Sequence, residues 1–286
     1  MESKGASKAA TYEYMELEQV EADLYIDYYN ERIRIDHYKG AFKNLLKELE
    51  VRREKQPFTK LIVYTKPTQW QQLIADGFQL ESIMKGYFNG VDNYVMCRYY
   101  SNERKKQGNW VEEDQLIDQV MAKESSAMKR LPDSYEMRKV RESDLYELAT
   151  FYGTVFSSYP TPIHEVDYLT KSLKGGTLFF IVTFEGEIVA AASAEVQNVF
   201  HNAEITDCAT NPDHRQFGLI RHIIKELENE LYEKRIYCTY SIARANSFGM
   251  NRVLKQMGYH YEGRLTNNCF MEGSYENLNV WVKYKK

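Results

Sequence analysis

Three features of the sequence predict an α/β fold of the α+β kind, a mixed central sheet flanked by helices. Apolar runs at 178–184 and 188–196, joined by Glu185-Gly186, predict a β-hairpin. From Gly218 onward, isoleucine and leucine recur at the spacing of a helix with one buried face. Other strand-like and helical runs alternate on either side of these segments. With 43% hydrophobic residues, the 286-residue chain can bury the core of one or two domains.

The predicted elements follow in order from about Ser134. A strand at 135–140 leads to a helix with Ser143 as its N-cap, because a serine hydroxyl can accept a hydrogen bond from a free N–H of the first turn. The remaining elements are the hairpin, a strand at 203–210, the helix from Gly218, a strand at 237–242, a helix at 246–257 and strands ending at 277–284. We therefore divide the chain into domains at 1–104 and 134–286, joined by a charged linker helix at 105–133.

The composition argues against several classes of protein. The net charge of −4 offers no basic surface for nucleic acid. The four cysteines form no C-x-x-C pair, so neither a zinc site nor a disulfide framework is indicated. Residues 1–10 are polar and no apolar run reaches the length of a membrane span, so neither a signal peptide nor a membrane segment is predicted. We expect a cytoplasmic protein with no metal and with no nucleic-acid or membrane partner.

The segment 203–220 carries the most informative motif. A strand-like run ends in the turn Asn211-Pro212-Asp213, and a helix is predicted to open directly after it. Free N–H groups at a helix start bind phosphate, helped by the helix dipole, and Gly218 lets an anion approach because it has no Cβ. The candidate anion-binding residues are Arg215, Gln216, Phe217, Gly218, Leu219 and Ile220. An ordinary strand-to-helix connection is the alternative, so the surrounding elements must decide.

This motif and the order of elements over 134–286 resemble the GNAT acetyltransferases. The resemblance implies that the helix start holds the pyrophosphate of acetyl-coenzyme A, the co-substrate. It also implies a bulge in the preceding strand, where backbone N–H groups of Ala209 and Thr210 face the coenzyme. Asn246 stands where family members often place an asparagine that contacts the coenzyme, although a plain N-cap explains it equally well.

Acetyl transfer to an amine needs a general base, because alkyl amines with a pKa near 10.4 are protonated at neutral pH. Glu204 and Asp207 lie on the strand before the motif and are predicted to point to opposite faces. The resemblance favours Glu204 as the base, with Asp207 as runner-up; the alternative is a structural carboxylate or a charge tether for a cationic substrate. Many family members protonate the leaving thiolate with a tyrosine. Leu254 occupies that position here, which leaves Tyr259, a water molecule or no acid at all.

The N-terminal part repeats pieces of the C-terminal part. Gly40–Glu50 resembles Gly218–Glu228, and each copy is followed by a strand, a helix ending in Gly-aromatic and a glycine turn. This order predicts an internal duplication, with chance similarity between two amphipathic helices as the alternative. The alignment places His37 opposite Arg215, and the N-terminal copy lacks a full set of preceding strands. We therefore expect it to bind no coenzyme A, but to extend the sheet, shape the substrate pocket or form a homodimer contact.

Segments 156–164, 239–245, 249–251 and 261–281 resemble the beta-lysine N-acetyltransferases, and the resemblance extends over the whole chain. It implies acetylation of the ε-amine of beta-lysine, which yields a neutral compatible solute for osmoadaptation. This acceptor carries two ammonium groups and one carboxylate, so ionic partners are expected. The candidates are Glu276 and Asp207 for the second ammonium, Arg244 for the carboxylate, and Asn267, Asn268 and Tyr159 as polar contacts. For Tyr159, beside Pro160, plain loop packing is the alternative.

Two other functions stay open. The same chemistry could serve another amine, such as a polyamine, an aminoglycoside or a protein N-terminus. A non-catalytic sensor or scaffold that binds acetyl-coenzyme A is a different class, which Leu254 favours slightly. The Arg215–Gly218 turn together with Glu204 favours an enzyme.

Overall fold

A single mixed sheet of 13 strands joins both halves of the chain in this computed structural model, which describes residues 10–106 and 108–285. The N-terminal half contains β1 (Thr11–Leu17), β2 (Val20–Asp27), β3 (Arg32–Gly40), α1 (Phe42–Lys55), β4 (Lys60–Thr65), α2 (Trp70–Ala75), β5 (Gln79–Phe88), β6 (Val91–Tyr99) and α3 (Asn102–Lys105). After α4 (Trp110–Ala122), the C-terminal half contains β7 (Tyr135–Lys139), η1 (Glu142–Asp144), α5 (Leu145–Val155), α6 (Val166–Lys174), β8 (Leu178–Phe184), β9 (Glu187–Gln197), β10 (Asn202–Thr210), η2 (Pro212–Phe217), α7 (Leu219–Glu233), β11 (Cys238–Arg244), α8 (Phe248–Gln256), β12 (His260–Met271) and β13 (Ser274–Tyr284).

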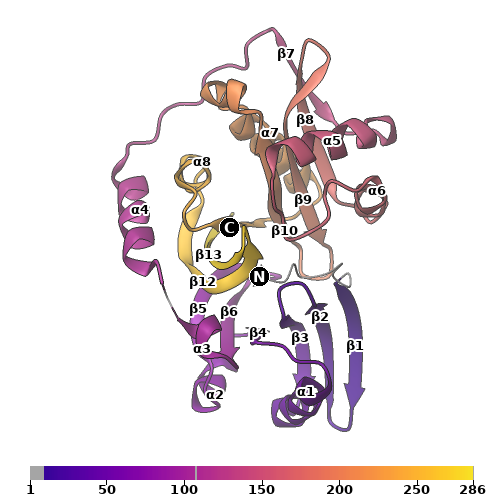
Figure 1. Cartoon of the computed structure of the whole chain (residues 1–286), viewed down its shortest axis with the longest axis vertical. Helices are drawn as coiled ribbons and strands as arrows, with labels where there is room; N and C mark the ends of the chain where they lie inside the picture. The colour runs from indigo at the N-terminus through magenta and orange to yellow at the C-terminus, as the bar shows by residue number, and fades with distance from the viewer. Residues whose placement is uncertain (1–9, 107, 286) are drawn as a thin grey trace.

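The strands pair in the same order on both sides of a central junction between β5 and β12. Outward from this junction the order is β5-β6-β4-β3-β2-β1 in one half and β12-β13-β11-β10-β9-β8-β7 in the other. Each half has one parallel pair, β3 with β4 and β10 with β11, flanked by antiparallel pairs. The repeated topology supports the predicted duplication, and it sets the two halves end to end (Figure 1).

One detail of the predicted alignment between the halves, His37 opposite Arg215, is wrong. His37 lies within β3 and not in a loop, because Ala41 alone separates β3 from α1. The corresponding connection in the C-terminal half runs over 211–218 and includes η2. The N-terminal half therefore has no counterpart of the anion-binding motif. Three strands, β1–β3, precede α1, whereas four strands, β7–β10, precede α7, so the N-terminal half lacks the full set of preceding strands, as expected.

A close backbone contact and a buried lysine hold the two halves together. Gly263 of β12 pairs with Ser82 of β5 at a φ of 134°, and a Cβ on this glycine would stand 2.2 Å from the carbonyl oxygen of Glu81. Next to this contact the buried Lys60 ammonium donates to Glu81 at 2.9 Å and to the carbonyl oxygen of Thr266 at 2.7 Å. Glycine is thus required where the two halves meet, and the lysine crosses from one half to the other.

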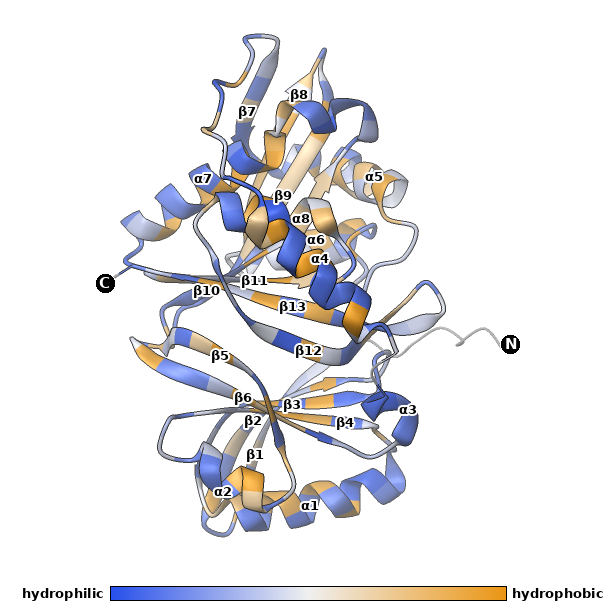
Figure 2. Ribbon diagram, turned by 90° about the vertical axis from the view of Figure 1, so that its left-hand side faces the viewer, coloured by the Kyte–Doolittle hydropathy of each residue, from blue (hydrophilic) through white to orange (hydrophobic). Residues whose placement is uncertain are grey.

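Helices cover both faces of the C-terminal sheet. The apolar faces of α4, α7 and α8 share one core cluster, and α5 and α6 build another against the opposite face. In α4, Ile117 and Val120 are buried, and the Lys255 ammonium donates to the last-turn carbonyls of Val120 at 3.1 Å and Met121 at 2.6 Å. Of the predicted linker at 105–133, residues 110–122 form the helix α4, which lies along the outside of α8 (Figure 2). Each described helix is too short or too polar to cross a lipid bilayer.

Two predicted caps are wrong because other groups satisfy the helix starts. Ser143 lies inside η1, where the carboxylate of Asp144 accepts the N–H of Arg141 at 2.7 Å. At α8, the hydroxyl of Ser247 accepts the N–H of Met250 at 3.4 Å, so Asn246 is an exposed turn residue one position ahead of the cap. The hairpin β8–β9 and strand β10 are confirmed, while α6 was not predicted.

Candidate active site

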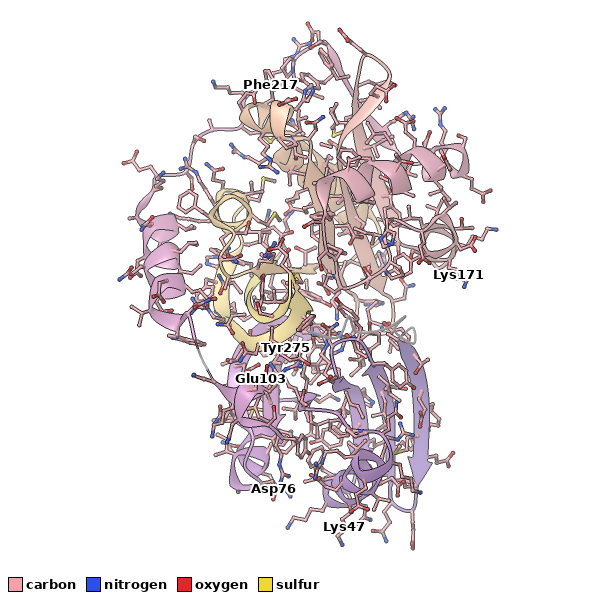
Figure 3. The ribbon with its side chains drawn as sticks, in the orientation of Figure 1. Lys47, Asp76, Glu103, Lys171, Phe217 and Tyr275 are labelled. Carbon is pink, nitrogen blue, oxygen red and sulfur yellow. The ribbon has the colours of Figure 1, made fainter. Side chains whose placement is uncertain are left out.

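A cavity of about 330 Å³ lies between the two halves of the chain. Its walls come from β1–β5 on one side and from the 156–161 loop and β9–β13 on the other. Aromatic rings dominate the N-terminal wall, and carboxylates cluster on the C-terminal wall. The start of α7, marked by Phe217, lies toward the far end of the C-terminal half from the junction, near which Tyr275 is found (Figure 3).

The strand β10 contains a bulge that decides which acids face the cavity. Its pairing with β9 shifts register between Thr206 and Ala209, and Asp207 adopts a φ of 52°. An extra residue in a strand reverses the alternation of side chains beyond it. Glu204, Thr206 and Asp207 therefore all line the cavity, and the prediction that the two acids face opposite sides is wrong. The predicted bulge is confirmed.

Next to the bulge, β10 and β11 separate from one another. They pair at Asn202–Cys238, Ala203–Thr239 and Glu204–Tyr240, and then part. Beyond this fork, β10 keeps its other neighbour, since Ala209 and Thr210 pair with β9. The backbone groups of 205–210 that would face β11 are left without a ladder partner there. Glu204 thus stands where a gap opens between two strands.

The environment of Glu204 prepares it to exchange a proton near neutral pH. Burial raises the pKa of this carboxyl to about 7, and the charge of Asp207 adds to the rise. The guanidinium of Arg34 and a hydrogen bond from Tyr240 oppose it. Glu195 lies directly opposite Glu204 on β9, and its pKa is raised by enclosure in the cavity and by the charges of Glu204 and Asp207, although part of its side chain reaches solvent.

Asp207 is held more firmly than Glu204. Its carboxylate accepts a hydrogen bond from the hydroxyl of Ser193 at 2.6 Å, and its backbone N–H donates to the hydroxyl of Tyr159 at 3.3 Å. Burial raises the pKa of Asp207, while these contacts oppose the rise. Tyr159 packs on Phe156, as expected of a loop residue, and it also lines the cavity, so a contact with the substrate stays a prediction.

The predicted substrate residues separate into two groups. Asn268 lines the cavity, and its buried Oδ1 has no hydrogen-bond partner among the described residues. Arg244 also lines the cavity, but Glu276 holds its guanidinium at 2.6 and 2.7 Å, and Glu272 at 3.1 Å. Asn267 lies elsewhere, where its side chain donates to carbonyl oxygens at the end of α3. The structure thus brings Tyr159, Arg244 and Asn268 to the cavity, and leaves Asn267 and Glu276 outside its wall.

The anion-binding motif begins with a 3₁₀ turn, not with the α-helix predicted from Arg215. The turn η2 ends at Gly218, whose φ of 66° is left-handed, and α7 begins at Leu219. No side chain of the described residues caps α7, so the first N–H groups, including those of Leu219 and Ile220, stay available. Arg215 and Gln216 are exposed, and Phe217 packs on the ring of Tyr135. Leu254 and Tyr259 are buried in the core under α7 and do not line the cavity.

Sequence reasoning missed the contribution of the N-terminal half to this site. Arg34 of β3 lines the cavity together with Arg32 and Asp36. The run Arg32-Ile33-Arg34-Ile35-Asp36 alternates charged with apolar residues, which is the signature of a strand with one polar face. That pattern could have indicated a charged wall, but it does not say what the wall faces.

Comparison with known proteins assigns the family. Residues 143–259 match the acetyltransferase (GNAT) family. The chain is 36% identical to the N-acetyltransferase YodP of Bacillus subtilis (strain 168) over 264 residues, which are 92% of this chain and 96% of that protein. The chain belongs to the beta-lysine N-acetyltransferase family of GNAT enzymes.

Two further relatives of this acetyltransferase are archaeal. It is 30% identical to the beta-lysine N(6)-acetyltransferase of Methanosarcina mazei (85% of this chain and 98% of that protein). It is 26% identical to the beta-lysine N(6)-acetyltransferase of Methanococcus maripaludis (89% and 93%). The similarity in each case includes the N-terminal half, which the family match at 143–259 does not reach. GNAT enzymes use acetyl-coenzyme A as the co-substrate, so the protein is an N-acetyltransferase with this acetyl donor.

Proposed function

We propose that this acetyltransferase moves the acetyl group of acetyl-coenzyme A to the ε-amine of beta-lysine, which yields N-epsilon-acetyl-beta-lysine. Two relatives that align over most of the chain are named beta-lysine N(6)-acetyltransferases, which supports this acceptor. The geometry contributes the observation that carries the proposal: a half-buried carboxyl, Glu204, at the fork between β10 and β11, where desolvation in the cavity raises its pKa to about 7. Acetylation leaves the acceptor electrically neutral, which suits a compatible solute.

The proposed coenzyme site runs along β10. The N–H groups at Leu219 and Ile220 bind the pyrophosphate, with Arg215 and Gln216 beside them and Gly218 allowing close approach. From there to Glu204 the strand extends for roughly 20 Å, over which the unpaired edge beyond the fork, including Ala209 and Thr210, can bond an extended amide-bearing arm. Phe217 and Asn246 are exposed just ahead of the first residues of α7 and α8, the two helices that border this path in the proposal.

Glu204 acts as the general base in this proposal. It accepts a proton from the ammonium of the acceptor, directly or through one water, and so makes the nitrogen lone pair available to the thioester carbonyl. Coenzyme A leaves as a thiolate, whose parent thiol has a pKa near 8.5, so no strong acid is needed. This explains how the enzyme can work with Leu254 in place of a tyrosine and with Tyr259 buried outside the cavity.

The cavity suits an acceptor with more than one ammonium group. Glu195, Glu204 and Asp207 place negative charge on one wall, and the unpartnered Oδ1 of Asn268 adds a neutral acceptor. The aromatic walls exclude water and offer ring faces to a cation. Arg244 is already held by two glutamates, so the carboxylate of the acceptor needs another partner.

Release of free thiol from acetyl-coenzyme A tests the proposal, with beta-lysine, alpha-lysine, spermidine and kanamycin compared side by side. Turnover confined to beta-lysine is the expected result. Faster turnover of another amine would keep the chemistry and overturn the acceptor. Coenzyme binding without turnover of any amine would favour a sensor.

A further inference from the structure

We propose that Arg34, on β3 of the N-terminal half, binds the carboxylate of the acceptor and so makes that half the specificity element of the enzyme. The inference rests on the proposed function only in taking the acceptor to be an amine that also carries a carboxylate. Four observations support it: the place of Arg34 in the duplicated topology, the way its guanidinium is held, the state of the other arginines in the cavity, and the charge of the opposite wall.

Arg34 occupies in the N-terminal half the position that Glu204 occupies in the C-terminal half. In the parallel pair β3–β4 the third pairing joins Arg34 to Ile62, and in the parallel pair β10–β11 the third pairing joins Glu204 to Tyr240. The repeated strand order carries both side chains to one cavity, where Ile62 and Tyr240 also lie. The duplication therefore presents a cation and an anion at equivalent positions of one pocket.

The guanidinium of Arg34 is held in place before any ligand arrives. Its Cζ lies 4.8 Å from the ring centroid of Tyr25 and 5.2 Å from that of Tyr64, so two tyrosines border it. Asp36 accepts hydrogen bonds from Nε and from Nη2, the latter at 3.2 Å. In the described part of the chain no acceptor is bound to Nη1, and 24% of the side chain is exposed. An oriented guanidinium with donors left over is suited to a carboxylate.

The other arginines of the cavity are less available. Arg32 is held by Asp27 at 2.9 Å and by the carbonyl oxygen of Asn268 at 3.1 Å. Arg244 is held by two glutamates, as described above.

The cavity presents opposite charges on its two walls, as an acceptor with a carboxylate and an amine at its two ends requires. Beta-lysine carries its carboxylate at one end of a six-carbon chain and its ε-amine at the other. Arg34 stands on the N-terminal wall, and Glu204 with Glu195 and Asp207 stands on the C-terminal wall. An acceptor that spans the cavity therefore sets its carboxylate on Arg34 when its ε-amine reaches Glu204. Amines without a carboxylate lose that anchor.

A competing role for Arg34 is purely electrostatic. Its positive charge lowers the pKa of Glu204, so its removal raises that pKa and weakens the enzyme at neutral pH for every amine. The two roles differ in one observable, the preference for an acid over its amide. Beta-lysine amide keeps both amines and the carbon chain but has no carboxylate. Assays at pH 9, about two units above the wild-type pKa of Glu204, reduce the electrostatic effect, and the ratio of acid to amide is taken within each variant.

The experiment measures kcat/KM for beta-lysine and for beta-lysine amide with the wild type, Arg34→Gln and Arg34→Lys. Arg52→Gln is the matched control, because Arg52 is in the same half, is 22% exposed and is paired with Glu13, but does not line the cavity. We expect the wild type and Arg52→Gln to prefer the acid by about 100-fold, the value of a charge-assisted hydrogen-bond pair. Arg34→Gln should bring this ratio near one through a higher KM for the acid, and Arg34→Lys should give an intermediate ratio.

Each outcome of this experiment either supports or overturns the role proposed for Arg34. If Arg34→Gln slows both acceptors equally and keeps the ratio, Arg34 does not bind the carboxylate. If Arg34→Gln does not fold, as judged by thermal unfolding, the ratio for Arg34→Lys decides in the same way. Turnover of alpha-lysine but not beta-lysine would overturn the acceptor alone, and alpha-lysine amide then replaces the beta-lysine amide. Turnover of spermidine with neither lysine, or of no amine, would overturn both proposals.

Discussion

Replacement of Glu204 by glutamine tests the mechanism most directly. The amide keeps the size of the side chain and its place beside Tyr240 but cannot accept a proton. An amine with a pKa near 10.4 is neutral in only about one molecule in 250 at pH 8. A variant that must wait for the neutral amine should therefore lose about 250-fold in kcat/KM at pH 8, which corresponds to about 3 kcal/mol of transition-state stabilisation.

The same mechanism predicts how kcat/KM changes with pH in the wild type and in Glu204→Gln. Glu204 has a raised pKa of about 7, so it is protonated and inactive as a base below that value. The wild-type kcat/KM should fall about tenfold per pH unit below pH 7 and level off above it. In Glu204→Gln this inflection should disappear. Its kcat/KM should rise about tenfold per pH unit up to about pH 10, where the ammonium group of the free acceptor itself loses its proton. The assay is thiol release from acetyl-coenzyme A at saturating coenzyme between pH 6 and 10.

Glu195→Gln is the matched control, because Glu195 faces the same cavity directly opposite Glu204. It should raise the KM for a cationic acceptor and keep the inflection of the pH profile, shifted to lower pH because one neighbouring negative charge is gone, as expected of a charge tether. The reasoning about Glu204 is refuted if Glu204→Gln loses activity equally at pH 8 and pH 10, or if it behaves like Glu195→Gln. Glu204 would then be a tether as well, and the base would have to be sought at Asp207.

Two further substitutions test the coenzyme motif and the support beneath the site. In Gly218→Ala the new Cβ has room, since only Arg221 Cδ lies within 4 Å of it, at 3.9 Å, but the φ of 66° costs an alanine about 1 kcal/mol. The melting temperature should therefore fall slightly, and the KM for acetyl-coenzyme A should rise about tenfold. An unchanged KM would remove Gly218 from the proposed coenzyme site. Asn251→Ala leaves the side-chain N–H groups of Trp281 and Asn279 without the acceptor they now reach at 2.8 and 2.9 Å, and should lower the free energy of unfolding by about 3 kcal/mol in urea titrations. A loss below about 1 kcal/mol would mean that water or another group replaces the amide.

Much of the fold could be predicted because it depends on local pattern. The β8–β9 hairpin, β10 and the amphipathic α7 follow from alternation, turn residues and helical spacing in a short window. Helix starts were harder, because several polar residues compete for each cap. Ser247 caps α8 one residue after Asn246, and no side chain in the described part of the chain caps α5 where Ser143 was expected, since the carboxylate of Asp144 accepts the N–H of the preceding Arg141.

In the candidate site, too, the residues in contiguous motifs could be predicted, and their orientation could not. The acids of β10 and the glycine before α7 could be found in the sequence, because each belongs to a contiguous motif. Whether Glu204 and Asp207 face the same side could not, since a bulge adds a residue without changing the hydrophobic pattern. Asn267 shows the opposite error, in which a polar residue predicted to contact the substrate has a structural role: its side chain donates a hydrogen bond to a carbonyl oxygen at the end of α3.

By itself the sequence determined the types of element, the duplicated order and the chemistry available on β10. Only the tertiary structure decided that β5 and β12 meet, that Gly263 is needed at their contact and that Arg34 therefore shares a cavity with Glu204. The physical reason is that periodicity reports which face of an element is buried, and it does not report which distant element buries it. That choice depends on backbone approach and side-chain packing across the whole sheet.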